Sequence, residues 1–164
     1  MKLNLDVIER INSIDFSSVI YSIVEKDDGP RWAVAKALRA EKQYRQFLYI
    51  HATNPEICVV PSKLVDEFWH QHMLDSFKYA EDCNSALGHF LHHFPYLGTG
   101  GATDRELLRQ SYLATTDLTA KVFGCDDSVG DESTCGGNCS HSIETTQSKL
   151  IRPTPTFEYV AQVA

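Results

Sequence analysis

The chain has 164 residues, 43% of them hydrophobic, and a formal net charge of −7 at pH 7. This length is sufficient for one hydrophobic core and too short for two domains of ordinary size. The negative charge argues against nucleic acid or an anionic membrane as a partner, because phosphate binding needs clustered Lys and Arg. No stretch approaches the roughly 20 apolar residues of a membrane span, and the first residues lack the apolar run of a signal peptide. We therefore expect a cytoplasmic protein.

The distribution of charge divides the chain into a domain and a tail. Residues 122–148 contain five acidic residues and no Lys or Arg. Such a stretch, rich also in Ser, Thr and Gly, cannot bury enough apolar area to offset chain entropy. We predict a helical domain over residues 1–124, a disordered acidic Cys/Gly tail over 125–149, and an extended segment over 150–164 that can dock on the domain.

Two helices are predicted in the first third of the chain. Asp15 is a suitable N-cap, and apolar residues recur from there every three or four positions until an Asp-Asp-Gly sequence at 27–29. Pro30 suits the first turn of a longer helix, which reaches about Ile50. The short apolar run at 57–60 is either a strand or a buried connection.

Three further helices are predicted between residue 62 and residue 124. Ser62 and Asp75 can each cap a helix, and Gly88 is a suitable C-terminal stop for the second one. Thr103 and Glu106 form a capping box that opens the last helix. The pattern predicts an all-α fold, a single compact helical bundle of about five helices with an irregular tail.

Five of the seven histidines fall between residues 70 and 93, in two short clusters. The first cluster is WHQH at residues 69–72, and the second is HFLHH at residues 89–93. Imidazole is the commonest metal ligand in proteins and titrates near neutral pH. Each cluster lies near a predicted helix end, so we expect the two to meet at one end of the bundle.

Helical spacing limits which of these residues can share an ion. Asp66 and His70 are four residues apart and lie on one face, whereas His70 and His72 are about 200° apart. Either the helix loosens before Asp75, or the two histidines play different parts. In the second case His70 pairs with Asp66, which is a ligand or fixes the ring tautomer, and His72 faces the second cluster.

The candidate ligands leave the identity of the metal open. Two histidines and one carboxylate suit non-haem iron, whereas three or four nitrogen and sulfur ligands suit zinc. Neighbouring His92 and His93 cannot face the same way in regular structure, so one of them is expected to face solvent. Alternatively, the histidines are polar surface at helix ends, since their spacing is not a recognised metal motif. The candidate ligands are His70, His72, His93, Asp66 and His92.

The histidine region resembles the glycine-rich domain-containing-protein-like family of bacteria and plants. The resemblance rests on VDEFWHQHML at residues 65–74 and on HHFP at 92–95, and it covers about residues 30–98. It implies a functional cluster of His70, His72 and His93 but no particular reaction. The positions that match the family signature are Asp66, Trp69, His70, His72, Tyr79, Gly88 and His93.

We therefore expect a metal-binding helical protein whose cofactor is a divalent transition metal, zinc or non-haem iron. Its chemistry would be metal-assisted hydrolysis or oxygen-dependent oxidation of a small molecule or peptide. Tyr79 is the candidate catalytic side chain, as a donor of a proton or hydrogen bond, although a buried Tyr is usually structural. The alternative is a non-enzymatic interaction module whose tail, with Cys125, Cys135 and Cys139, binds a partner or a metal.

Overall fold

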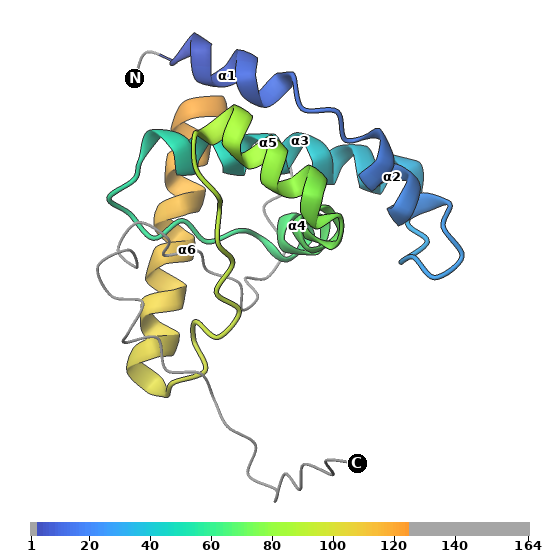
Figure 1. Ribbon diagram of the computed structural model, residues 1–164. Helices are drawn as coiled ribbons and strands as arrows, with labels where there is room; N and C mark the ends of the chain where they lie inside the picture. Colours follow the sequence, from blue (N-terminus) through green and yellow to red (C-terminus); the bar gives the residue numbers. More distant parts are fainter. Residues whose placement is uncertain (1–2, 125–164) are drawn as a thin grey trace, which may run out of the picture.

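The computed structural model describes residues 3–124 (Figure 1). Within this range the chain forms six α-helices and no extended strand, which confirms the predicted all-α class. The predicted tail over 125–149 and the predicted segment over 150–164 lie outside the described residues. The helices are α1 (Leu5–Asn12), α2 (Ser17–Val24), α3 (Val34–Thr53), α4 (Lys63–Leu74), α5 (Ser76–Leu87) and α6 (Ala102–Phe123).

The ends of α4 and α5 follow the predicted capping residues. The Ser62 hydroxyl accepts a hydrogen bond from the Val65 amide, and the Asp75 carboxylate accepts one from the Lys78 amide. Both bonds satisfy amides that have no partner within their helix. Gly88 ends α5 with φ 79°, a left-handed conformation that glycine adopts without steric penalty.

The start of α6 differs from the predicted capping box. The helix begins at Ala102, and Thr103 lies inside its first turn. No side chain caps α6, and the Asp104 carboxylate in its first turn accepts hydrogen bonds from the amides of Gly98 at 2.6 Å and Gly100 at 2.9 Å. Glu106 instead binds side chains one turn further along the helix. The prediction was wrong because Asp104 reaches back to the preceding loop.

The start of α3 also lies later than predicted, at Val34 rather than at Pro30. Arg31 has φ 54°, which is a left-handed backbone conformation. The Trp32 amide then donates a hydrogen bond to the carbonyl of Ile23 in α2. The residues after Pro30 therefore form a connection fixed on α2 before α3 begins.

Two short helices form the N-terminal part. In α2, Phe16 occupies the cap position, and the Asp15 carboxylate accepts a hydrogen bond from the Ser17 amide at 2.9 Å. Sequence periodicity did not predict α1. This helix packs against α3 and α5, and the Arg10 side chain donates to the carbonyl of Ala86 at 3.1 Å. An eight-residue helix is marginal in isolation, so α1 depends on these tertiary contacts.

Helix α3 is central to the packing, because it contacts α1, α2, α4 and α6 (Figure 1). Aromatic side chains fill the space between α2, α3 and α4. The ring of Phe68 lies 5.6 Å from that of Phe16 and 5.4 Å from that of Tyr44, measured between centroids. Burial of large rings contributes most of the stabilisation in a core of this kind. This aromatic core fixes the position of α4, which carries Asp66, His70 and His72.

Two irregular connections complete the fold. The apolar run at 57–60 is a buried connection, since Val59 and Val60 are fully buried and the Val60 amide donates to the Thr115 hydroxyl of α6 at 2.9 Å. The second connection runs from α5 to α6 and carries His93. It is held to the core by the buried side chain of Leu91.

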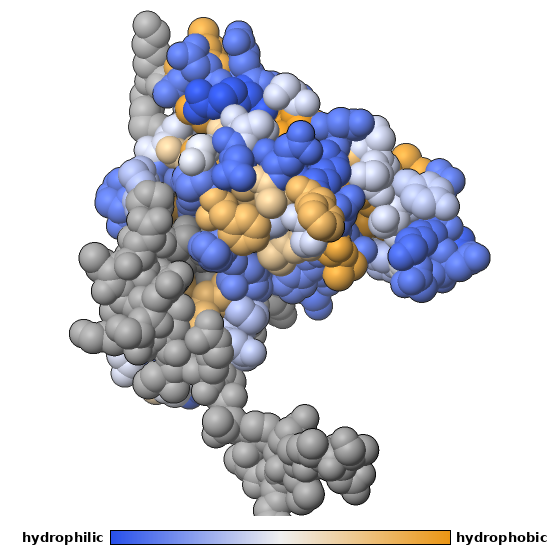
Figure 2. Space-filling model, in the orientation of Figure 1, coloured by the Kyte–Doolittle hydropathy of each residue, from blue (hydrophilic) through white to orange (hydrophobic). Residues whose placement is uncertain are grey.

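The surface has a small apolar area where α4 and α5 meet. Figure 2 shows apolar side chains gathered in the middle of this face. Leu74 of α4 and Phe77 of α5 are exposed there, so neither contributes to the core. None of the helices among residues 3–124 has the length and apolar character required to span a bilayer.

Candidate metal centre

Asp66, His70 and His93 come together at the junction of α4 and the connection that follows α5. His93 Nε2 lies 3.2 Å from His70 Nε2 and 3.1 Å from Asp66 Oδ1. His70 Nε2 lies 3.7 Å from Asp66 Oδ2. Among the described residues, these three form the group of His, Cys, Asp and Glu side chains whose ligand atoms are close enough to hold one ion.

The geometry of this group has a simple origin. Asp66 and His70 are one helical turn apart, so their side chains project from the same face of α4. His93 reaches this face from the connection between α5 and α6. The side chains of Asp66 and His93 are each 8% exposed, whereas that of His70 is 47% exposed. The group is therefore closed by protein on one side and reaches solvent at His70.

The spacing of the three ligand atoms fits a bound metal. Zinc binds nitrogen and oxygen at about 2.0–2.1 Å, which places two ligands of a tetrahedral site roughly 3.3 Å apart. His93 Nε2 lies 3.1 Å from Asp66 Oδ1 and 3.2 Å from His70 Nε2, both close to that value, and His70 Nε2 lies 3.7 Å from the other carboxylate oxygen, Oδ2. Hydrogen bonding alone satisfies the group poorly, because the single site on His93 Nε2 faces both a carboxylate oxygen and another imidazole nitrogen.

The ring of His93 packs against Trp69, which belongs to a hydrogen-bonded chain. The ring of Trp69 stands edge-on to that of His93, with 4.8 Å between the centroids. Trp69 Nε1 donates a hydrogen bond to the Tyr79 hydroxyl at 2.9 Å, and that hydroxyl donates to the carbonyl of Leu91. Burial raises the pKa of Tyr79, so its hydroxyl keeps its proton. Tyr79, the predicted catalytic residue, is 2% exposed, and its hydroxyl both accepts and donates a hydrogen bond.

His72 lies outside the group, on another side of α4. Its Nδ1 atom is 3.1 Å from the Tyr44 hydroxyl, and its Nε2 atom is 2.9 Å from Asp82 Oδ2. Burial lowers the pKa of His72, and the hydrogen bond with Asp82 opposes this in part. A neutral ring that accepts from Tyr44 and donates to Asp82 satisfies both contacts. Asp82 also pairs with Lys78, whose Nζ lies 2.9 Å away.

The structure thus brings three of the five predicted ligands together and leaves two apart. Asp66, His70 and His93 meet, whereas His72 joins α3 to α5 through Tyr44 and Asp82. His92 is exposed, and its ring lies against that of Phe90, with centroids 4.8 Å apart. The predicted alternation between His92 and His93 therefore holds, with His92 facing solvent.

Sequence reasoning missed the partner of His72. Tyr44 lies 28 residues earlier, on α3, and its hydroxyl is buried with the ring. No local spacing connects the two residues, so only the packing of α3 on α4 reveals the pair. The second predicted site, formed by Cys125, Cys135 and Cys139, lies outside the described residues.

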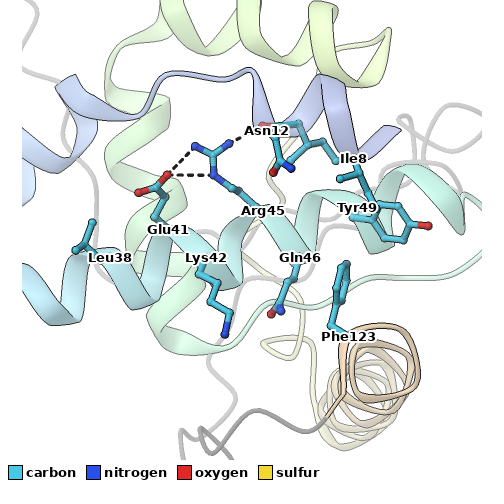
Figure 3. A pocket seen from close by; sticks show the side chains of 10 residues that line it. Ile8, Asn12, Leu38, Glu41, Lys42, Arg45, Gln46, Tyr49 and Phe123 are labelled. Carbon is cyan, nitrogen blue, oxygen red and sulfur yellow. Dashed lines mark hydrogen bonds and ion pairs between the residues drawn. The ribbon is translucent and has the colours of Figure 1, made fainter. Parts of the chain in front are cut away.

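A separate groove lies between α1 and α3, away from the group on α4. It has a volume of about 370 Å³ and is closed at one side by Phe123 from the last turn of α6 (Figure 3). Glu41 and Arg45 pair on its wall, so these charges are already neutralised. Neither Asp66, His70 nor His93 lines this groove.

Comparison with known proteins identifies a family for this chain. A search of curated proteins finds no match. A search of solved structures finds none either. The model of the UCP032817-like family matches residues 7–118, a range that includes Asp66, His70 and His93. Because this match covers more than half of the sequence, the chain belongs to the UCP032817-like family.

Proposed function

We propose that Asp66, His70 and His93 bind one divalent transition-metal ion, zinc or iron(II), and leave further coordination positions open. The observation that supports this is the convergence of the Asp66 carboxylate and two imidazole nitrogens, with one ligand atom from each residue within 4.8 Å of the others. Two histidines and a carboxylate are the ligand set of many non-haem iron centres. Three protein ligands plus a water is the usual arrangement of catalytic zinc.

The exposure of the group supports a reactive centre over a purely structural one. A structural zinc site is closed by four protein ligands, whereas this group offers three among residues 3–124. His70 borders solvent, so a water or substrate can approach from that side. The metal would supply Lewis acidity or an activated water, and the class of reaction would be hydrolysis or oxidation of a small molecule or peptide.

Metal content and metal-dependent stability test this proposal. The experiment uses the untagged full chain, because a histidine tag would bind metal itself. After chelation, we expect zinc(II), or iron(II) without oxygen, to bind at one ion per chain and to raise the melting temperature. At a free metal concentration of 100 times the Kd, binding raises the free energy of unfolding by about 2.7 kcal/mol.

The chain offers a matched pair of variants for this test. His93→Ala removes a proposed ligand, whereas His92→Ala removes the adjacent exposed imidazole. We expect His93→Ala and His70→Ala to weaken binding by at least about 10-fold and His92→Ala to leave it unchanged. Absence of stoichiometric metal and of any thermal shift in the native chain would contradict the proposal, as would equal losses in His92→Ala and His93→Ala.

A further inference from the structure

The connection that carries His93 is held in place by a tyrosine hydroxyl. Tyr79 donates a hydrogen bond to the carbonyl of Leu91, two residues before His93. The same hydroxyl accepts a hydrogen bond from Trp69 of α4. Trp69 is in turn the neighbour of His70 in the sequence. One polar chain thus links the helix that carries Asp66 and His70 to the segment that carries His93.

This link matters because regular structure does not fix residues 90–94, which have neither helical nor strand hydrogen bonding. A ligand on such a segment needs other contacts to hold its position. Leu91 provides two such contacts: its side chain is buried, and its carbonyl accepts the Tyr79 hydrogen bond.

We propose that Tyr79 is a positioning residue of the metal centre. Its hydroxyl holds the carbonyl of Leu91 so that His93 meets Asp66 and His70 before an ion binds. This inference rests on the proposed metal function. The Tyr79 hydroxyl contacts Leu91 and Trp69, so its effect reaches the ion through these two residues.

Two tyrosine-to-phenylalanine variants test this role against a general loss of stability. Tyr79→Phe removes the hydroxyl that holds Leu91, and Tyr44→Phe removes a hydroxyl that binds His72 instead. Both rings are almost fully buried, so the two changes are closely matched. We expect Tyr79→Phe to weaken zinc(II) binding by about 10- to 100-fold, the range for residues that orient ligands. We expect Tyr44→Phe to change it less than about 2-fold, within the noise of non-coupled sites.

Cobalt(II) is a spectroscopic probe whose absorption would not change through a general loss of stability. The visible absorption of bound cobalt reports the geometry of its ligands, so Tyr79→Phe should alter the spectrum and Tyr44→Phe should not. Equal affinities and spectra in the two variants would overturn the positioning role while the metal function stands. Failure of the unaltered chain to bind zinc or cobalt would instead overturn the proposed function.

Hydrogen exchange of the unaltered chain provides a test that does not require Tyr79→Phe to fold. If Tyr79 holds the segment beforehand, the amides of residues 89–93 should exchange at similar rates with and without zinc. Protection that arises only when zinc is added would contradict the inference, because the ion itself would then order the segment.

Discussion

His70 and His72 are separated by one residue but have opposite surroundings. The side chain of His70 is 47% exposed, and that of His72 is 1% exposed. Burial lowers the pKa of His72, so this ring resists protonation in the folded protein. In the unfolded chain its pKa returns to about 6.5. Protons therefore favour the unfolded state below that pH.

This difference predicts a pH dependence of stability that belongs to His72. Because its pKa is lower in the folded state, its contribution is fully present above about pH 6.5 and is lost as the pH falls below that value. The loss approaches about 1.4 kcal/mol per pH unit for one proton. Urea unfolding between pH 7 and pH 5, with a chelator present, measures it.

The control for this prediction is a second histidine variant. His72→Gln removes the titrating group and should flatten the slope of unfolding free energy against pH. His92→Gln alters an exposed ring and should leave the slope as it is in the unaltered chain. A slope that His72→Gln does not change would assign the pH dependence to other groups.

At this scale, helix geometry predicted part of the site from the sequence. The four-residue spacing of Asp66 and His70 placed them on one face, and the two-residue spacing separated His72 from them. It did not predict that His72 would contact Tyr44, because that contact depends on how α3 packs against α4. Local spacing determines direction along one helix, and tertiary packing determines what lies there.

At the scale of the element, the start of α6 shows that a polar residue in the first turn can bind the preceding loop while no side chain caps the helix. Asp104 accepts two backbone hydrogen bonds from the preceding loop, whereas Thr103 is exposed. We expect Asp104→Ala to lower the free energy of unfolding by about 1 kcal/mol, the usual net contribution of a hydrogen bond. Thr103→Ala should cost less than about 0.5 kcal/mol, as for other surface changes.

Urea unfolding at pH 7 compares the contributions of Asp104 and Thr103. A larger loss in Thr103→Ala than in Asp104→Ala would show that the capping box suggested by the sequence forms in solution. The caps at Ser62, Asp75 and Gly88 were predicted correctly, because each acts within one helical turn. α1 was not, because its eight residues are stabilised by contacts with α3 and α5.

At the scale of the whole molecule, Arg45 joins the N-terminal part to the central helix. Its guanidinium donates to the carbonyls of Ile11 and Ile14, and it pairs with Glu41 of α3. It also lies over the ring of Phe16, with 4.5 Å to the centroid. A lysine has one compact ammonium group and cannot reproduce this fork of donors.

We therefore expect Arg45→Lys to destabilise the entire domain. The loss should be about 2 kcal/mol, since hydrogen bonds to charged groups each contribute roughly 1.5 to 3. Arg39→Lys makes the same chemical change on an exposed position of α3 and should stay within about 0.5 kcal/mol. Thermal unfolding followed by circular dichroism measures both, and equal effects would argue against the bridging role of Arg45.

Periodicity and capping predicted the all-α class, but not which helix is central. The arrangement of α1, α2, α4 and α6 around α3 depends on side-chain complementarity between segments far apart in the sequence. Arg45 illustrates this, since its partners lie more than 30 residues earlier. Such contacts leave no periodic signal in the chain.

The edge-on contact between Trp69 and His93 gives the protein an intrinsic optical reporter. Trp69 is fully buried and lies 4.8 Å from the imidazole, centroid to centroid. With the proposed ion on His93, a filled-shell metal would leave the excited indole largely undisturbed, whereas a redox-active one would quench it. The emission of Trp69 would then distinguish zinc from iron without any added dye.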